Sequence, residues 1–150
     1  SFPEYPELID EMIALSREEM GHFKMVHEQL LKRGYVLGRD RKDEYVNQLI
    51  RFFPKGGSRT TQLVHRLLIA GLIEARSCER FRLLSEQLKD KELAEFYHKL
   101  MVSEANHYTM FLKFARKYGE REEVDRKWQD LLDFEAEIMK DLGKDKTIHG

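Results

Sequence analysis

Between residues 91 and 118, an apolar stripe is interrupted by one glutamate and one histidine. Apolar side chains recur there at steps of three and four residues, which predicts a long amphipathic helix. The stripe comprises Leu93, Tyr97, Leu100, Phe111, Phe114 and Tyr118. Glu104 and His107 lie on the same stripe, one turn apart, and a buried charge is costly unless it is paired or bound to a metal. Because bundle helices use this spacing to offer a carboxylate and an imidazole to one metal ion, both residues are candidate ligands.

The same pattern occurs earlier in the chain, at Glu19 and His22. These two residues lie on a stripe formed by Leu8, Met12, Leu15, Val26 and Leu30. A third Glu-x-x-His, at Glu95 and His98, lies off the apolar stripe and is expected to face water. With 18 Glu and 6 His in 150 residues, such a spacing also arises by chance. Position on an apolar stripe therefore selects the first and last copies as candidates for a shared metal site.

Helical periodicity extends over most of the chain, which contains only three prolines and is rich in Glu, Lys, Leu and Arg. We expect long helices over residues 7–32, 61–89, 91–118 and 120–142, and a short amphipathic helix near residues 44–53. Gly34 and Gly119 are expected to end helices, and Ser58 or Thr60 to cap one. Residues 143–150 are expected to be loose. The length of 150 residues fits one all-α domain over 1–150, with an outer helix at 120–142.

Two glutamates of the 61–89 helix compete for a ligand role. Glu74 lies on the stripe that should face the next helix, and Glu79 lies about 140° away around the axis. In a helical hairpin, residues equidistant from the turn are level, and the midpoint between Glu74 and Glu104 is the expected turn at residue 89. Glu74 is therefore preferred as a ligand. Glu79 is the second choice, or it pairs with a neighbouring arginine in an outer shell.

The connection over residues 35–60 is long for a compact domain and strongly basic. From Lys32 to Arg66 there are nine Lys or Arg residues against three acidic residues. One interpretation is a solvated loop. The other is a cationic patch for the phosphate backbone of a nucleic acid.

The composition of the chain indicates in which cellular compartment the protein is expected. The single cysteine, Cys78, excludes an internal disulfide and fits a reducing, cytoplasmic environment. No apolar run approaches the length of a membrane span, so no membrane partner is expected, and no secretory leader is apparent.

The full candidate ligand set has three carboxylates and two imidazoles, namely Glu19, His22, Glu74, Glu104 and His107. Such donors on the helices of one bundle suit a pair of iron or manganese ions. The usual set is symmetric, with a lone Glu and a Glu-x-x-His supplied twice, and here one lone Glu is missing. The same hairpin geometry puts it upstream of Ser1, so the first bundle helix is expected to be missing from this chain.

Three segments together resemble a known family. These are Ile73 to Phe81 (IEARSCERF), Arg17 to Phe23 (REEMGHF) and Ser103 to Tyr108 (SEANHY). They resemble the tRNA 2-methylthio-N6-isopentenyladenosine hydroxylases, a branch of the ferritin-like di-iron proteins.

The resemblance implies a ferritin-like four-helix bundle with a long crossover connection and an extra C-terminal helix. It also implies two iron ions that use O2 and two electrons from an unidentified donor to hydroxylate the isopentenyl chain of the adenosine next to the anticodon. The basic segment would then hold the tRNA anticodon stem-loop. The expected phosphate contacts are Arg39, Arg41, Lys42, Lys55 and Arg59.

Two other functions remain open from the sequence. One is a ferritin-like protein for iron storage or peroxide scavenging, although rubredoxin-type cysteine pairs are absent. The other is a metal-free helical module that binds RNA through the basic segment, with its buried Glu and His residues paired with arginine.

Overall fold

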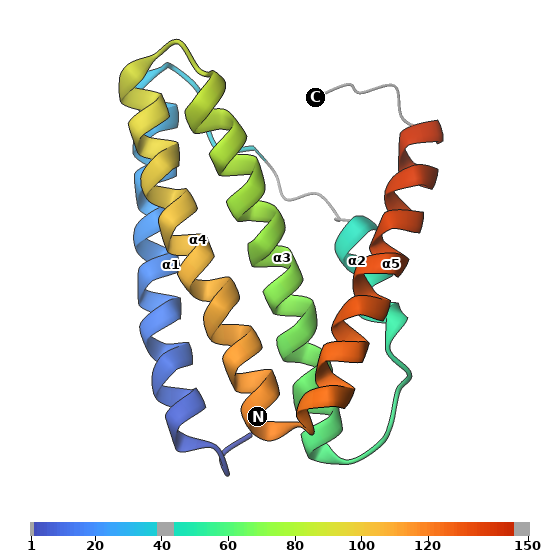
Figure 1. Cartoon of the computed structure of the whole chain (residues 1–150). Coiled ribbons are helices and arrows are strands. Elements are labelled where there is room, and N and C mark those ends of the chain that lie inside the picture. Colours follow the sequence, from blue (N-terminus) through green and yellow to red (C-terminus); the bar gives the residue numbers. More distant parts are fainter. Residues whose placement is uncertain (1, 39–43, 146–150) are drawn as a thin grey trace. The chain divides into compact units, whose positions relative to one another are not determined.

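The computed structural model describes residues 2–38 and 44–145, and all regular secondary structure in these ranges is helical. Five helices follow one another, α1 (Pro6–Lys32), α2 (Glu44–Phe52), α3 (Arg59–Gln87), α4 (Lys91–Tyr118) and α5 (Arg121–Asp145) (Figure 1). The all-α prediction is confirmed, and the predicted helix boundaries agree to within three residues. Residues 143–145, which were expected to be loose, continue the last helix, so that part of the prediction is wrong.

The chain divides into two compact units, Ser1–Lys42 and Asp43–Gly150. The first unit contains α1, which has proline in its first turn, where a missing N–H costs nothing. Gly34 ends the helix with a φ of +77°, a conformation that other residues rarely adopt. The backbone N–H of Tyr35 then donates to the carbonyl of Leu30 at 2.9 Å. The predicted helix end at Gly34 is therefore confirmed.

The second unit is built on the antiparallel hairpin of α3 and α4, which lie side by side (Figure 1). Side-chain caps fix where both helices begin. The Ser58 hydroxyl accepts a hydrogen bond from the N–H of Thr61 at 3.0 Å, which decides between the two predicted caps. Asp90 accepts from the N–H of Leu93 at 3.1 Å and starts α4 three residues after α3 ends. Each cap satisfies a donor that the first helical turn leaves unpaired.

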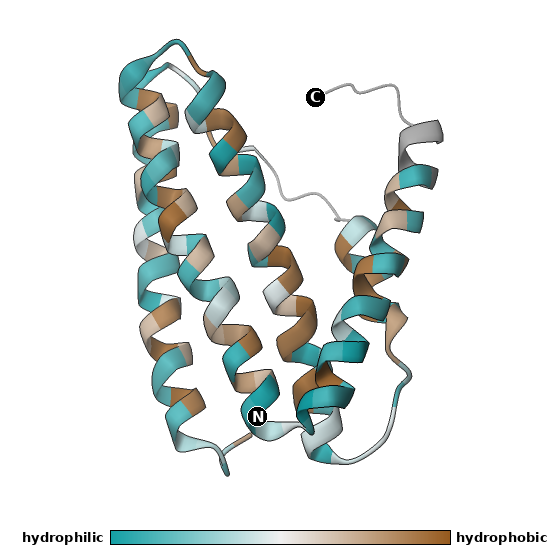
Figure 2. Cartoon of the chain, viewed as in Figure 1, coloured by the Kyte–Doolittle hydropathy of each residue, from teal (hydrophilic) through white to brown (hydrophobic). Residues whose placement is uncertain are grey.

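The core of the second unit lies along the hairpin and is completed by α2 and α5, which contact each other and α3. Figure 2 shows hydrophobic positions concentrated in the N-terminal half of α3. Helix α5 also contacts α4, as predicted for an outer helix. The most deeply buried side chains include Leu49, Leu68, Leu72, Phe114, Val124 and Leu131. Among the described residues, no helix has the length and apolar character needed to span a bilayer.

We expect the Gly119→Ala variant to unfold more easily, by about 1–3 kcal/mol, because overpacking forces neighbours to shift. A Cβ at Gly119 would lie 2.6 Å from Cγ2 of Val124 and 3.1 Å from Cγ2 of Val64. Urea titration followed by circular dichroism measures the change. Gly21→Ala is the control, because a Cβ there meets nothing within 4 Å and alanine favours the helix. Equal stabilities of the two variants would contradict this account of the α4–α5 corner.

Candidate metal centre

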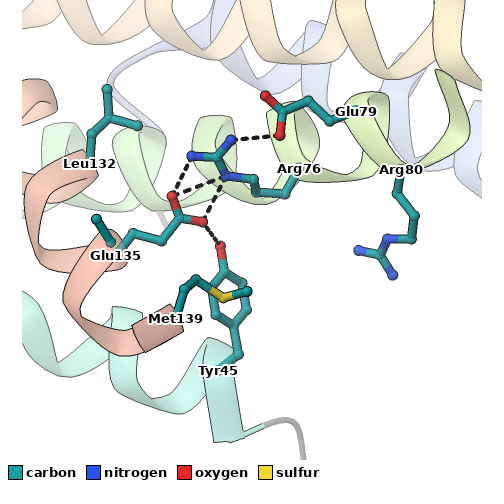
Figure 3. A pocket seen from close by; sticks show the side chains of 8 residues that line it. Tyr45, Arg76, Glu79, Arg80, Leu132, Glu135 and Met139 are labelled. Atoms are coloured by element: carbon teal, nitrogen blue, oxygen red, sulfur yellow. Dashed lines mark hydrogen bonds and ion pairs between the residues drawn. The ribbon is translucent and has the colours of Figure 1, made fainter. Parts of the chain in front are cut away.

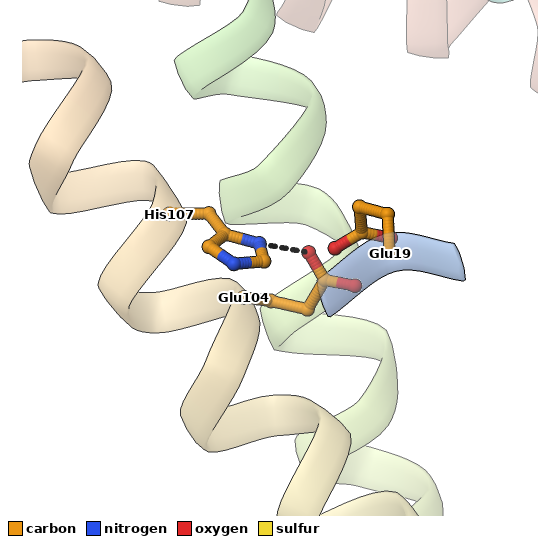
Figure 4. A group of neighbouring side chains, drawn as sticks. All are labelled: Glu19, Glu104 and His107. Atoms are coloured by element: carbon orange, nitrogen blue, oxygen red, sulfur yellow. Dashed lines mark ion pairs between the residues drawn. The ribbon is translucent and has the colours of Figure 1, made fainter. Parts of the chain in front are cut away.

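Helix α4 presents a buried carboxylate and imidazole on one face. Glu104 is 6% exposed and His107 is 4% exposed, and Nδ1 of His107 lies 3.8 Å from a carboxylate oxygen of Glu104 (Figure 4). The comparison pair, Glu95 and His98, is exposed on the same helix, as predicted. The two Glu-x-x-His copies on α4 therefore differ in burial. Only the copy on the apolar stripe, Glu104 and His107, places metal-binding groups in the interior.

Helix α3 packs closely against α4 one turn from this pair. Gly71 on α3 faces α4, since a Cβ there would lie 3.5 Å from Cβ of Phe111. Leu100 and Phe111 flank the Glu104–His107 pair along α4 and are both buried. The apolar flanks keep water from the two polar groups, so the interaction between them and any bound cation is strengthened.

Helix α3 brings Glu74 to the neighbourhood of this pair. Glu74 is half-buried, and the opposition of Gly71 and Phe111 sets a register in which Glu74 lies within about one turn of Glu104 and His107. Cys78 lies one turn further along α3, and the Glu104 carboxylate acts on it electrostatically. Burial, and then the negative charge of Glu104, raise the pKa of the Cys78 thiol. The α3–α4 hairpin thus carries two of the predicted carboxylate ligands and one imidazole, of which Glu104 and His107 lie together.

The other predicted Glu-x-x-His lies in the first unit, on α1. Nδ1 of His22 is 3.3 Å from a carboxylate oxygen of Glu19, so the two side chains are within reach of one another. Nε2 of His22 lies 3.8 Å from a carboxylate oxygen of Glu18, which was not among the predicted ligands. Both Glu19 and His22 are half-buried. Helix α1 therefore holds its own carboxylate–imidazole pair, as α4 does.

Glu79, the second-choice ligand, takes part in a different network (Figure 3). Nη1 of Arg76 donates to Glu79 at 2.6 Å, and Nε of Arg76 donates to both carboxylate oxygens of Glu135 at 2.8 and 3.0 Å. The Tyr45 hydroxyl donates to Glu135 as well. This Arg76 network joins α2, α3 and α5, and it satisfies a carboxylate that is only 3% exposed.

The contacts within the Arg76 network raise the pKa values of two of its members, Tyr45 and Arg76. Burial, followed by the hydrogen bond and negative charge of Glu135, raises the pKa of Tyr45 well above its ordinary value. The hydrogen bond from Arg76 to Glu135 likewise raises the pKa of the guanidinium. Sequence analysis predicted that Glu79 could pair with a neighbouring arginine, and the Arg76–Glu79 contact confirms it. It did not identify the contacts that Arg76 and Tyr45 make with Glu135. The available signal was Glu135, an acidic residue on the apolar face of α5.

The residues expected to contact RNA are only partly described. Arg39, Arg41 and Lys42 lie outside the described residues. Lys55 is exposed in the segment between α2 and α3, and Arg59 is exposed at the start of α3. The two described cations thus lie near the beginning of α3, where both are accessible to a ligand.

Comparison with known proteins identifies the family of this chain. Residues 2–150 match the family described as tRNA-(MS[2]IO[6]A)-hydroxylase (MiaE). Two curated relatives are both called tRNA 2-(methylsulfanyl)-N(6)-isopentenyladenosine(37) hydroxylase. The relative from Pseudomonas putida is 35% identical over 143 residues, which cover 95% of this chain and 68% of the relative.

The relative from Salmonella typhimurium is 30% identical over 143 residues, which cover 95% of this chain and 52% of that protein. The chain thus spans about two thirds of the length of one relative and about half of the other. With nearly every residue of the chain inside the family match, and the buried Glu104–His107 pair inside it as well, the chain belongs to the MiaE family of tRNA hydroxylases.

Proposed function

We propose that this chain acts as a metal-dependent hydroxylase of a modified adenosine in tRNA, and that it oxidises the isopentenyl group of the nucleotide next to the anticodon. The observation that carries the proposal is the buried Glu104–His107 pair in a chain that matches the MiaE family over residues 2–150. A hydroxylase that inserts oxygen into a C–H bond of the isopentenyl group requires a strong oxidant, and a carboxylate–imidazole metal site shielded from water suits that task.

The proposed site holds two iron ions. Glu104 and His107 on α4, Glu74 on α3, and Glu19 and His22 on α1 would be the protein ligands. Carboxylate oxygens and imidazole nitrogens are the donors that iron accepts in helical bundles, so the residues present fit the metal. In this proposal residues 1–150 form one ferritin-like domain, and Glu79 stays in an outer shell through Arg76.

The protein side chains have defined tasks in the proposed reaction. Iron ions bound at the site would supply the reduction of O2 by two electrons and two protons, so that one oxygen atom enters a C–H bond and the other leaves as water. Glu104 and His107 would hold the metal from α4, and the buried side chains of Leu100 and Phe111 would exclude water from it. The two electrons would come from a separate donor, which is a required partner.

The tRNA would be held through its phosphates by the basic segment. Lys55 and Arg59 are exposed near the start of α3, and Arg39, Arg41 and Lys42 add three further cations in the sequence. An electrostatic grip tolerates different loop sequences and weakens as salt rises. We therefore expect affinity for an anticodon stem-loop to fall steeply with ionic strength.

Metal analysis combined with a nucleoside assay tests the proposed function. Metal content is measured on this chain and on a version extended upstream, because the relatives are longer. Each protein is then given reductant, O2 and tRNA bearing 2-methylthio-N6-isopentenyladenosine. The tRNA is digested to nucleosides, and mass spectrometry shows whether the modified nucleoside has gained one oxygen atom. Two irons per chain and the hydroxylated product are expected. RNA binding with no metal in either version would instead support the metal-free module, and a large closed assembly in solution would support storage.

A further inference from the structure

A cavity lies on the side of α3 that faces away from α4. It encloses about 520 Å³ between the end of α2, the segment that follows it and the N-terminal half of α3, a volume typical of small-ligand sites. Its apolar lining includes Ile50, Phe53, Ile69 and Ile73. On α3, Ile69 and Ile73 lie about 160° around the axis from Gly71, which faces α4. The cavity is therefore separate from the Glu104–His107 pair.

A buried imidazole lines this cavity. His65 is 7% exposed, and its ring stacks on Phe53 with 4.1 Å between the ring centroids and 5° between the planes. Within the described part of the chain, Nε2 of His65 has no hydrogen-bond partner. Burial, followed by the positive charge of Lys127, lowers the pKa of His65 and keeps the ring neutral. A neutral buried imidazole with an unused nitrogen is unfavourable unless a ligand or water completes its bonding.

The rim of the cavity is cationic. Lys55 and Arg66 both line it and are exposed, and the described lining residues include no acidic side chain. A ligand that suits these features has a negatively charged group for the two cations and a flat, weakly polar ring for the apolar interior. It also has a polar edge that can pair with His65. An unpaired ribonucleotide has all three features, because its phosphate, base face and base edge are separately accessible.

We propose that this cavity binds one unpaired nucleotide of the anticodon loop, beside the nucleotide that is hydroxylated, with its phosphate at Lys55 and Arg66 and its base edge at His65. This inference rests on the proposed function, because it takes tRNA as the substrate. The cavity lies on a different face of α3 from Glu74, and Glu104 lies on α4. We therefore expect the cavity to position the RNA and to take no part in the chemistry. Loss of the cavity contacts should raise KM and leave kcat nearly unchanged.

Binding of a fluorescent anticodon stem-loop RNA tests the proposal. In Lys55→Ala with Arg66→Ala, we expect the slope of log affinity against log salt to become shallower by about one to two, one for each lost phosphate contact. In His65→Phe, which keeps an aromatic ring against Phe53, affinity should fall about tenfold, the size of one hydrogen bond, with no loss of thermal stability. Lys91→Ala at the other end of the hairpin is the control and should bind as the unchanged chain does.

The outcomes separate this inference from the proposed function. If the unchanged chain binds and hydroxylates the RNA while the double variant and His65→Phe both match it in affinity and KM, the cavity proposal is wrong and the proposed function stands. Equal affinity of the unchanged chain for a loop-free RNA duplex would also overturn the cavity proposal, since a duplex offers no unpaired nucleotide. If the unchanged chain neither binds nor modifies the stem-loop, both proposals fail together.

Discussion

Replacing Glu104 by alanine is expected to abolish metal binding at α4 and to reduce tRNA hydroxylation by at least about a hundredfold. Loss of partners that only support a ligand already costs 10- to 100-fold, so loss of a ligand itself should cost more. The carboxylate is 6% exposed and lies 3.8 Å from His107, so water is a poor substitute for it. Iron per chain and conversion of the modified nucleoside are the two measurements.

Glu95→Ala provides a matched control for Glu104→Ala. It removes the glutamate of an identically spaced pair on the same helix, but that pair is exposed. We expect its iron content and activity to equal those of the unchanged chain. Glu104→Gln, which keeps the side-chain volume, separates loss of the ligand from loss of packing. If Glu104→Ala kept its full complement of iron, the ligand assignment would be wrong, whatever happened to activity.

The second large effect is expected at Arg76. In Arg76→Leu, the Glu135 carboxylate, which is 3% exposed, loses its only cation partner among the described residues. Breaking a buried ion pair from one side destabilises by about 3–5 kcal/mol, and the lower end applies here because the Arg76 side chain is 35% exposed. The free energy of unfolding from urea titration, followed by circular dichroism, measures the loss.

Two further variants show whether the destabilisation in Arg76→Leu comes from the buried Glu135 charge that is left without a cation partner. Glu135→Leu combined with Arg76→Leu should recover most of the stability, because no charge is then left buried. Arg116→Leu removes a guanidinium whose hydrogen bond to Asp125, at 2.7 Å, is exposed, and it should cost less than about 1 kcal/mol. A double variant as unstable as Arg76→Leu alone would refute the account of the network.

Local signals explain why the helices could be predicted from the sequence. Ser58 and Asp90 cap α3 and α4 with their own side chains, and Gly34 and Gly119 end α1 and α4. Each signal acts within a few residues of the boundary that it sets. The apolar stripe likewise distinguished the buried Glu104 and His107 from the exposed Glu95 and His98. Helix boundaries and the buried face of a helix, which depend on residues nearby in the sequence, were therefore predictable.

Contacts between distant segments were not predictable in the same way. Arg76 and Glu135 are 59 residues apart, and Tyr45 and Glu135 are 90 residues apart. No local pattern records that these side chains meet, since each fits an ordinary amphipathic helix when considered alone. The same reason hid the stacking of Phe53 on His65. By contrast, the pairing of Glu79 with a neighbouring arginine was predicted, because Arg76 is only three residues away on the same helix.

The way α2 is held also determines how the second unit should open in solution. Nine residues are fewer than an isolated helix needs in water, so α2 depends on tertiary contacts for its existence. Those contacts include the Tyr45–Glu135 hydrogen bond and the stacking of Phe52 on Phe134, 4.7 Å between ring centroids, which both tie α2 to α5. The amide hydrogens of α2 and of the middle of α5 should therefore exchange with solvent in a single cooperative event, although the two helices are far apart in the chain.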